Sequence, residues 1–551
     1  MRWILVLFLC SACSESTSPV DMGSKEASVD APMVAVDWTL RFDTSAGLPL
    51  PIQLLGQYDL SGALFAYDQQ AGMIDAMKST GFSEWRVGVG RWEVSTRVLP
   101  TLTDGSSCVA ELMGLPTEAF PPGCSTTSCS TNDLDLMASR DWFTTVDATP
   151  VTLADTEDDA RYALDYVRKV IDVSHAFGAQ PFVNIDLVPR ALSSREEPLR
   201  EAQRFSSLPS PKSVACMSSF TNGVSNAAPA NAAVFAAAAT GLVKRVVEGS
   251  GGEPGRSVQY WEVWNEPEMP HFWHDGWPAG ADAFFSGLAI PTLMALDSYR
   301  EESTKADVKA LRFGVGSFAH AATAAEVIPS FDAAAIPVDF FSFHAYPKPE
   351  QALETVDEIA HLEGLLAEST HYKQAELVLA EWGPNLGGAH QDWDPESMDV
   401  PLLVARVLAL GAAAGLDRAH HTMFYDFYEG IPFGLLRHDL SPKPLYHAYA
   451  LLARVITPGA LRLPPLDDES GRLEGGVGAV LASKGADGSL RVLLVNTADT
   501  PRTLALVREG SPVERARITR FDTPNEAPLS EEASFPLALP ARSLVLIEPV
   551  D

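Results

Sequence analysis

The chain has 551 residues, 46% of them hydrophobic, and a formal net charge of −32 at pH 7. This length and composition supply enough apolar material for one large domain and one further domain. The acidic charge argues against nucleic acid or an anionic membrane as a partner, because both are held by clustered Lys and Arg.

The N-terminal stretch up to residue 34 is expected to direct export. A basic residue and an apolar run that is too short to span a bilayer indicate a signal peptide over residues 1–13. Cys13 follows Ser-Ala as in a bacterial lipobox, although Cys10 stands where Leu is usual; an ordinary secretory signal cleaved nearby is the alternative. Residues 14–34 are then a flexible tether. The predicted location is extracytoplasmic, either secreted or held on the bacterial cell envelope by a lipid on Cys13.

Strand and helix signals alternate along the next part of the chain. Expected strands, rich in β-forming residues, are 52–58, 84–89, 181–187, 258–264, 311–317, 338–344, 376–381 and 420–427. Helical periods between or after them include 71–80, 161–177, 232–247, 402–414 and 446–455. Eight such alternations favour a closed parallel (β/α)₈ barrel over an open sheet, in a domain that covers residues 35–455.

Two polar insertions interrupt the predicted barrel, at about 92–158 and 193–230, and the first is expected to shape the rim of the site. The cysteines outside the signal fall in these insertions: Cys108, Cys124, Cys129 and Cys216. An even number in an exported chain is compatible with two disulfides of unreadable connectivity. A zinc site competes with this interpretation, but neither the C-x₁₅-C-x₄-C spacing nor a neighbouring His favours it.

The pattern changes after residue 455. Short strands separated by Gly, Asp and Pro turns are expected at 477–483, 490–496, 503–507, 515–520 and 544–547. They predict an antiparallel β-sandwich domain over residues 456–551, and residues 35–43 are a candidate further strand of it.

Two carboxylates each follow a buried strand of the predicted barrel. In the segment Trp261–Pro267, β-forming residues precede Asn265-Glu266, and Pro267 cannot continue a ladder. Glu381 ends a short apolar run in the same way and is followed by Trp382. Because the carboxyl ends of barrel strands converge on one face, we expect Glu266 and Glu381 to face one sugar ring as acid and nucleophile.

The segment Trp-Glu-Val-Trp-Asn-Glu-Pro, with Phe272-Trp273 shortly after, resembles the strand-four signature of clan A glycoside hydrolases, most closely family 39. That family contains β-xylosidases, α-L-iduronidases and exopolysaccharide-degrading enzymes. Further segments that match the family, in its order, are 81–87, 181–183, 338–347, 381–382 and 426–429.

The resemblance implies a retaining glycosidase in which Glu266 is the acid/base and Glu381 the nucleophile. Their pKa values must differ, and the expected device is a cation or hydrogen bonds on the nucleophile with a more apolar environment for the acid. Arg86 matches the family Arg that contacts the nucleophile. Further candidates for hydrogen bonds to Glu381 or the sugar are His344 and Tyr346, and Asn265 is the expected partner of the substrate 2-hydroxyl.

Other residues have two interpretations. Trp264, Trp273 and Trp382 can be core residues or aromatic walls for a sugar; a functional role is favoured for Trp273 and left open for Trp264. Glu429 can hold a sugar hydroxyl or be a solvated loop charge. Glu262, four residues before Glu266, is interpreted as a structural hydrogen-bonding group, and Glu268 is the alternative acid.

The chain departs from the family on strand two, where Arg86-Val87-Gly88 replaces the common Arg-x-His, so the sugar stays open and an iduronidase role is disfavoured. The expected partner is an oligosaccharide or polysaccharide, with no cofactor and no metal. One alternative is an endo-acting exopolysaccharide hydrolase, and another is a surface-anchored glycan-binding lipoprotein without catalysis. A third is a metal-dependent hydrolase that uses residues such as His344, His420 and Asp426, although adjacent His420 and His421 point to opposite faces of a strand.

Overall fold

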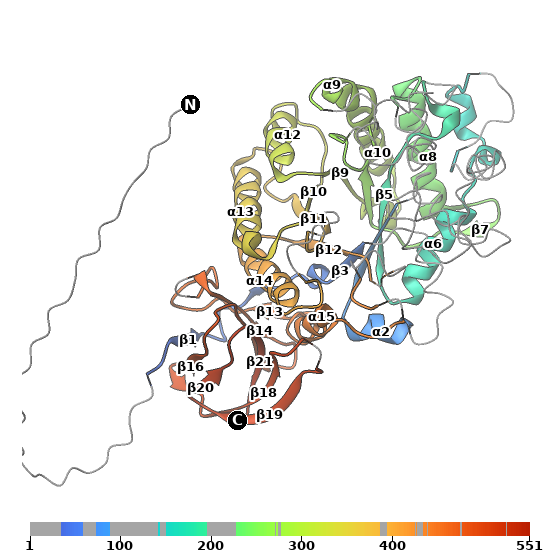
Figure 1. Cartoon of the computed structure of the whole chain (residues 1–551). Helices are drawn as coiled ribbons and strands as arrows, with labels where there is room; N and C mark the ends of the chain where they lie inside the picture. Colours follow the sequence, from blue (N-terminus) through green and yellow to red (C-terminus); the bar gives the residue numbers. More distant parts are fainter. Residues whose placement is uncertain are drawn as a thin grey trace, which may run out of the picture. The chain divides into compact units, whose positions relative to one another are not determined.

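The computed structural model describes residues 35–58, 73–88, 142–143, 150–194, 227–269, 272–273, 277–385, 394–424, 426, 434–437, 439–473, 476–524 and 526–550 (Figure 1). The predicted signal peptide and tether, all six cysteines and most of the two insertions lie outside these residues. The elements described below belong to one compact unit, Val36–Asp551.

Eight parallel strands form a closed barrel, which confirms the predicted fold class. They are β3 (Gly56–Tyr58), β4 (Glu84–Gly88), β5 (Gln180–Ile185), β8 (Tyr260–Val263), β9 (Arg312–Phe318), β10 (Phe340–Ala345), β11 (Glu376–Trp382) and β12 (Arg418–Thr422). Neighbouring strands pair in chain order, and β12 closes the barrel on β3. This order is the one produced by repeated strand–helix units.

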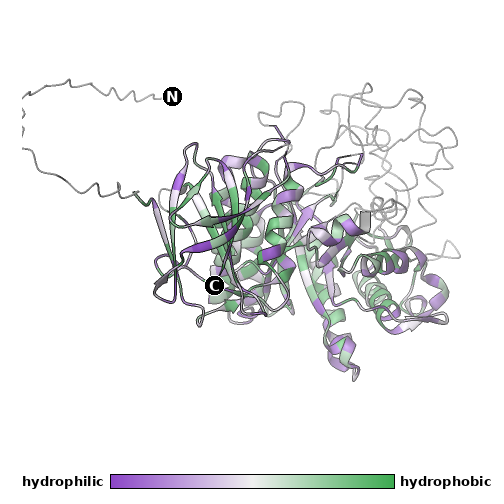
Figure 2. Cartoon of the chain, turned by 90° about the horizontal axis from the view of Figure 1, so that it is seen from below, coloured by the Kyte–Doolittle hydropathy of each residue, from purple (hydrophilic) through white to green (hydrophobic). Residues whose placement is uncertain are grey.

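Helices follow the strands. The main ones are α2 (Met73–Ser79), α6 (Asp165–Ala176), α8 (Ala232–Glu248), α10 (Ile290–Glu302), α12 (Ala321–Ala333), α13 (Ala352–Glu368), α14 (Asp399–Ala414) and α15 (Pro444–Val455). Figure 2 shows hydrophobic and hydrophilic residues alternating around them, as expected for helices with one face on a sheet. In α8, Asn231 caps the start by accepting from two backbone N–H groups, and Gly249 with φ 88° ends the helix. No helix in the described ranges combines the length and hydropathy needed to cross a bilayer.

Two strand limits differ from the sequence prediction. The strand expected at 420–427 is β12, which begins earlier, at Arg418, and ends at Thr422. Met423 then adopts a left-handed backbone, with φ 71°, which cannot continue a ladder. The strand expected at 52–58 starts instead as a 3₁₀ turn, Ile52–Leu54, before β3.

The C-terminal residues form two further sheets. The larger has the order β19 (Leu529–Ser534), β18 (Arg515–Phe521), β21 (Ser543–Pro549), β15 (Leu490–Asn496), β14 (Gly478–Lys484), β13 (Leu461–Arg462) and β2 (Leu48–Pro49). The smaller contains β1 (Trp38–Phe42), β16 (Arg502–Arg508), β17 (Ser511–Pro512) and β20 (Leu537–Leu539). One buried cluster takes side chains from both sheets, including Trp38, Leu504, Val480 and Val492, which is the core of a β-sandwich.

The first strand of the chain belongs to the β-sandwich, although it precedes the barrel in the sequence. The segment expected at 35–43 contains β1, which pairs in parallel with β16 of the smaller sheet. The larger sheet also contacts the barrel helices: Ser483 Oγ donates to the Val455 carbonyl at 2.7 Å, and Arg454 Nη1 donates to Thr519 Oγ1 at 2.9 Å. Leu481, Leu493 and Leu544 of this sheet belong to the barrel's own hydrophobic cluster.

A buried polar cluster fills the amino-terminal end of the barrel. Arg418 donates to Glu84, Glu376 and the Tyr260 hydroxyl, and its guanidinium lies 3.7 Å from the centroid of the Tyr260 ring. His420 Nε2 lies 2.8 Å from Glu84 Oε2. A buried charge is tolerated only with such partners, so this cluster is a structural plug at the strand starts.

Glu363 on α13 packs against the end of α14. Gly415 there has φ 103°, and a Cβ at this position would lie 2.6 Å from Glu363 Cγ. Burial, and then the Asp417 carboxylate, raise the pKa of Glu363 from 4.5 to about 7. Burial likewise raises the pKa of Asp417 to about 6.

We predict that Glu363→Gln increases thermal stability at pH 8 more than at pH 4.5. An acid whose folded pKa is raised binds protons more readily in the folded state, so folding stability falls as pH rises from the unfolded to the folded pKa. Glutamine removes this cost. Thermal unfolding at both pH values measures the effect, with Glu326→Gln on exposed α12 surface as the control. An equal change in Tm at the two pH values would contradict the prediction.

Candidate active site

The candidate site lies at the carboxyl ends of the barrel strands, where the backbone is strained. Trp264 and Glu266 after β8, and Ser317 in β9, have φ of 77°, 42° and 45°. Such conformations cost on the order of 1–3 kcal/mol each and need support. Backbone hydrogen bonds supply it: Trp264 N donates to the Ile185 carbonyl at 3.0 Å and Glu266 N to the Ser317 carbonyl at 2.9 Å. Asn265-Glu266 therefore lies where strand becomes loop, as the sequence predicted.

A β-bulge turns Glu381 into the barrel. On β10 and β11, Phe343 pairs with Leu379 but His344 pairs with Glu381, so Ala380 is an extra residue. Val378 and Ala380 already point to the interior cluster, and regular alternation would turn Glu381 to the helices. The extra residue re-aims Glu381 to the side on which His344 lies.

A second bulge acts on β9. Phe341 pairs with Val315 and Phe343 with Phe318, so Gly316 and Ser317 together oppose one residue, Ser342. The Ser342 hydroxyl accepts from Ser317 N at 2.7 Å, which holds the bulge.

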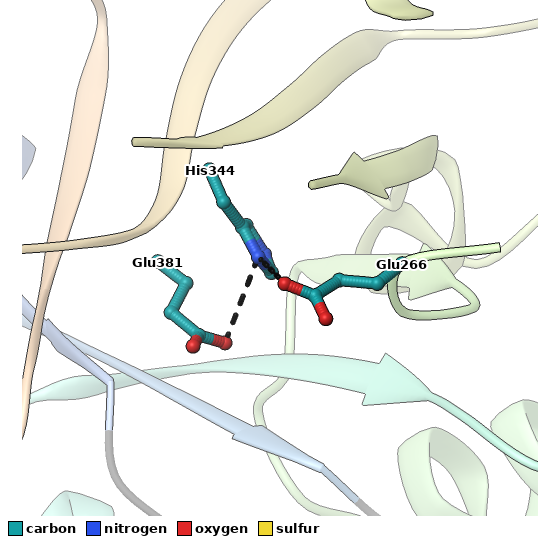
Figure 3. A group of neighbouring side chains, drawn as sticks. All are labelled: Glu266, His344 and Glu381. Atoms are coloured by element: carbon teal, nitrogen blue, oxygen red, sulfur yellow. Dashed lines mark hydrogen bonds and ion pairs between the residues drawn. The ribbon is translucent and has the colours of Figure 1, made fainter. Parts of the chain in front are cut away.

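His344 stands between the two glutamates (Figure 3). Its Nδ1 lies 2.8 Å from Glu266 Oε1 and 3.8 Å from Glu381 Oε2, and one oxygen of each glutamate lies within 4.8 Å of the other. Both glutamate side chains are 15% exposed, whereas that of His344 is 1% exposed. The two carboxylates therefore face each other across a floor formed by a buried imidazole.

Arg86 and Glu262 form a buried ion pair beneath this floor. Arg86 Nη2 and Nε donate to Glu262 Oε2 at 2.7 and 2.9 Å, and Arg86 Nη1 lies 3.8 Å from Glu381 Oε2. Glu262 also accepts from Asn184 Nδ2 at 2.6 Å and from the Ser317 and Ser342 hydroxyls. Despite burial, Arg86 and these hydrogen bonds lower the pKa of Glu262, which is ionised.

Tyr346 and Thr422 hold the other side of Glu381. The Tyr346 hydroxyl donates to Glu381 Oε1 and lies 2.9 Å from Thr422 Oγ1. The structure thus places three polar residues near Glu381: Arg86, which the resemblance implied, and the two further candidates His344 and Tyr346. His344 differs in that its closer carboxylate is Glu266.

The pKa of Glu381 departs from the sequence expectation. Burial, with the charge of Glu266 as a further contribution, raises the pKa of Glu381, and His344, Arg86 and the Tyr346 hydroxyl only partly oppose it. Burial also lowers the pKa of His344 to about 4, so the imidazole is neutral at neutral pH. A group of cations and donors around the nucleophile was expected to lower its pKa, but in the free protein desolvation outweighs them.

The aromatic predictions need correction. Trp273 is 1% exposed, donates from Nε1 to the Gly280 carbonyl at 3.1 Å and packs edge-to-face on Trp264 and Phe284. Trp382 is completely buried against His421. Neither ring has a free face for a sugar, because both are buried in the hydrophobic core.

The other predicted residues have these positions. Asn265 is buried and its Oδ1 accepts from Arg86 Nη2 at 2.9 Å. Glu429 lies outside the described residues. Glu268 is half-buried, its pKa raised chiefly by burial, and it does not belong to the group of ligand atoms that Glu266 forms with Glu381.

The ligands considered for a metal-dependent hydrolase do not converge. His420 binds Glu84 in the plug at the strand starts, and Asp426 pairs with Lys443 at 2.8 Å. His421 points away from His420, with its ring against Tyr449. Among the described residues, the group whose ligand atoms lie close enough to share an ion is Glu266, His344 and Glu381.

Five residues of the site were missed from the sequence: Asn184, Ser317, Ser342, Tyr58 and Thr422, the last of which contacts Tyr346. The first three hydrogen-bond Glu262, and the Tyr58 ring lies under the Arg86 guanidinium, 4.7 Å from centroid to Cζ. Asn184 and Ser342 are polar residues within apolar strands, and this pattern in the sequence could have identified them. Ser317 was not recognisable, because only the bulge brings it inward.

The fold of this chain is similar to that of solved glycosidases. A glucosidase from Croceicoccus marinus aligns at 14% identity, covering 93% of this chain and 99% of that one, with a TM-score of 0.58. A family 39 β-xylosidase from Caulobacter crescentus aligns at 17% identity, covering 93% and 100%, with a TM-score of 0.57. A family 39 enzyme from Xanthomonas axonopodis pv. citri aligns at 16% identity, covering 95% and 99%, also with a TM-score of 0.57. No protein-family model and no curated protein matches the chain in sequence.

These similarities define the class of fold. The chain has the architecture of a (β/α)₈-barrel glycosidase with a C-terminal β-sandwich, and the solved proteins that share it include several family 39 enzymes.

We predict that Tyr346→Phe raises the pKa of Glu381. The hydroxyl donates to Glu381 Oε1 and stabilises the ionised form, so its removal favours the protonated acid. Titration of ¹³C-labelled glutamate side chains by NMR measures the shift, and Glu381→Gln identifies the resonance. An unchanged or lowered pKa would show that the hydroxyl does not stabilise the carboxylate.

We also predict that Glu262→Gln lowers the free energy of unfolding by about 3–5 kcal/mol, because it leaves Arg86 buried with its main counter-ion removed. Urea denaturation measures this. The control is Glu532→Gln, which breaks the exposed pair with Arg515 and is expected to change stability by less than about 1 kcal/mol. Similar losses in the free energy of unfolding in the two variants would mean that the buried pair stabilises the fold no more than the exposed pair does.

Proposed function

We propose that this protein is a retaining glycoside hydrolase that cleaves O-glycosidic bonds with Glu266 as acid/base and Glu381 as nucleophile. The observation that carries the proposal is the spacing of the two carboxylates, whose nearest oxygens lie within 4.8 Å. Retaining enzymes place their carboxyl groups about 5–5.5 Å apart, whereas inverting enzymes leave about 6.5–9.5 Å for a water molecule. A limit of 4.8 Å between the nearest oxygens agrees with the shorter separation, and the products formed with azide distinguish the two mechanisms.

The reaction has two steps. Glu266 gives its proton to the leaving oxygen while Glu381 attacks the anomeric carbon, so the glycosidic bond breaks and a glycosyl ester forms. Glu266, now ionised, then takes a proton from water, whose oxygen attacks the same carbon and releases Glu381. Arg86, 3.8 Å from Glu381 Oε2, and the Tyr346 hydroxyl on Oε1 favour the negative charge that Glu381 carries before attack and regains on release.

The hydrogen bonds around His344 suit both ionisation states of Glu266. Ser317 Oγ accepts from Arg86 and has one proton, which it can give to Glu262 Oε2 at 3.1 Å or to His344 Nε2 at 2.9 Å. In the first arrangement Nε2–H donates to Ser317, and Nδ1 accepts from protonated Glu266. In the second, Nδ1–H donates to ionised Glu266. His344 can therefore hydrogen-bond Glu266 both when it acts as an acid and when it acts as a base.

The substrate class is inferred from chemistry and likeness. Two partly exposed carboxylates in a chain of net charge −32 disfavour a polyanionic glycan and favour an uncharged glycoside. The solved proteins of this fold include β-xylosidases and a glucosidase, which makes β-xylosidase-type activity on an oligosaccharide the first candidate. Exo or endo action on a polysaccharide depends on the insertions at about 92–158 and 193–230.

The proposal is tested by hydrolysis of a panel of aryl α- and β-glycosides. We expect activity on one sugar, with losses of about 10²-fold or more in Glu266→Ala and Glu381→Ala. Azide is small enough to replace either carboxylate. In Glu381→Ala, azide is expected to restore activity and to give the glycosyl azide of inverted configuration, because it attacks from the nucleophile's side. In Glu266→Ala, it is expected to restore activity and to give the glycosyl azide of retained configuration.

Glu268→Gln is the matched control, since Glu268 follows the same strand two residues later and is the alternative acid. It should retain activity. Loss of activity in Glu268→Gln with none in Glu266→Ala would reverse the acid assignment. Silence on aryl glycosides and on a polysaccharide array would favour the glycan-binding alternative.

A further inference from the structure

The two carboxylates and the imidazole that face each other also form a set of ligand atoms. Glu266 Oε1 lies 2.8 Å from His344 Nδ1, and Nδ1 lies 3.8 Å from Glu381 Oε2. In a tetrahedral zinc site with bonds of about 2.0–2.1 Å, neighbouring ligand atoms are roughly 3.3–3.4 Å apart. Of the two distances to Nδ1, one is shorter than this and the other longer, and the two glutamate oxygens lie within 4.8 Å of each other. Side-chain rotations that draw the two carboxylates together therefore place all three atoms around one ion.

The surroundings of His344 resemble those of a metal-binding histidine. Such a residue uses one ring nitrogen for the metal and donates its other N–H to a carboxylate, a backbone carbonyl or a water molecule; here a serine hydroxyl links the ring to a carboxylate. When His344 Nδ1 holds the lone pair, Nε2–H donates to Ser317 Oγ at 2.9 Å, and Ser317 donates to Glu262 Oε2 at 3.1 Å. The ring is buried and held in this orientation, so it needs little ordering when an ion binds.

Charge and access also favour a cation. When an ion displaces the proton of Glu266, the two carboxylates bring two negative charges, while the charge of nearby Arg86 is balanced by Glu262 at 2.7 Å. Glu381 Oε1 is occupied by Tyr346, which leaves Oε2, the atom nearer His344, for a metal. Both glutamates are 15% exposed, so an ion can reach them from solvent.

We propose that Glu266, His344 and Glu381 bind one Zn²⁺ ion and that this ion excludes the glycoside. Two carboxylate oxygens and one imidazole nitrogen suit Zn²⁺, whereas Ca²⁺ and Mg²⁺ require six or more oxygen ligands or near-octahedral geometry. The binding site stands on the three residues alone. Its effect on catalysis rests on the proposed function, because the metal ligands are the oxygen that transfers a proton and the oxygen that attacks the sugar.

Zinc binding is measured directly on the purified full chain, by competition with a chromophoric zinc chelator after alkylation of free thiols, so that cysteines do not contribute. We expect one equivalent of Zn²⁺ on the unmodified protein, with no comparable binding of Mg²⁺ or Ca²⁺. His344→Ala and Glu381→Gln should each weaken this binding at least about tenfold. Glu381→Gln keeps the size of the side chain and an oxygen for Tyr346, and circular dichroism confirms that each variant is folded.

The control is His371→Ala, which removes an exposed histidine paired with Asp332 at 3.0 Å and should leave zinc binding unchanged. Equal affinity in the unmodified protein, His344→Ala and Glu381→Gln would overturn the proposal, as would the absence of binding in all of them.

Inhibition kinetics distinguish the proposed zinc site from the proposed glycosidase function. On the glycoside that the panel identifies, Zn²⁺ should raise KM without changing kcat, and EDTA should reverse this. Inhibition with unchanged kcat supports the shared site, whereas inhibition that more substrate cannot relieve contradicts it. If no glycoside is hydrolysed but zinc binding depends on His344 and Glu381, the metal site stands and the proposed function fails.

Discussion

The site depends on the buried ion pair between Arg86 and Glu262. Their side chains are 1% and 0% exposed, and an isolated charge in such a place costs several kcal/mol. Glu262 on β8 is therefore satisfied from its neighbours: Arg86 comes from β4, Asn184 from β5, Ser317 from β9 and Ser342 from β10. Only a closed barrel brings these strands around one carboxylate. Arg86 also contacts Asn265, and Ser317 contacts His344, so the same network holds the buried residues next to the partly exposed Glu266 and Glu381.

The barrel uses one strand for both of its charged clusters. Along β4, Glu84 and Arg86 point inward, whereas Trp85 and Val87 belong to the hydrophobic cluster shared with the helices. Glu84 joins Arg418 and His420 at the amino-terminal end, and Arg86 joins Glu262 and Glu381 at the carboxyl end. The first cluster has no contact with the proposed catalytic pair and closes the barrel. The second leaves two carboxylates partly exposed, which is the arrangement that chemistry on a bound molecule requires.

Much of this could be predicted from local patterns. Barrel strands such as 181–187 and 338–344 are runs of β-forming residues, and Gly178 at the end of α6 is a helix terminator, so the strand–helix alternation was readable. The positions of Glu266 and Glu381 at strand ends were readable for the same reason. The two-residue strand β13 and the polar edge strand β19 were not, because a strand of two residues or one with few apolar side chains has no periodic signal. Trp273 and Trp382 were misjudged because a tryptophan beside a carboxylate has the same sequence whether it faces a sugar or the core.

The sequence by itself determined the order of strands and helices and the two strand-end glutamates, because these follow from local periodicity and from where apolar runs stop; the role of Arg86 was implied by the family resemblance. The tertiary structure alone decided how these residues meet. Regular alternation on β11 would have turned Glu381 outward, and the extra residue Ala380 reverses this; a second bulge does the same for Ser317. A bulge is defined by pairing with a neighbouring strand that lies far away in the chain. The pKa of Glu381 was decided in the same way, since burial depends on every element that surrounds the carboxylate.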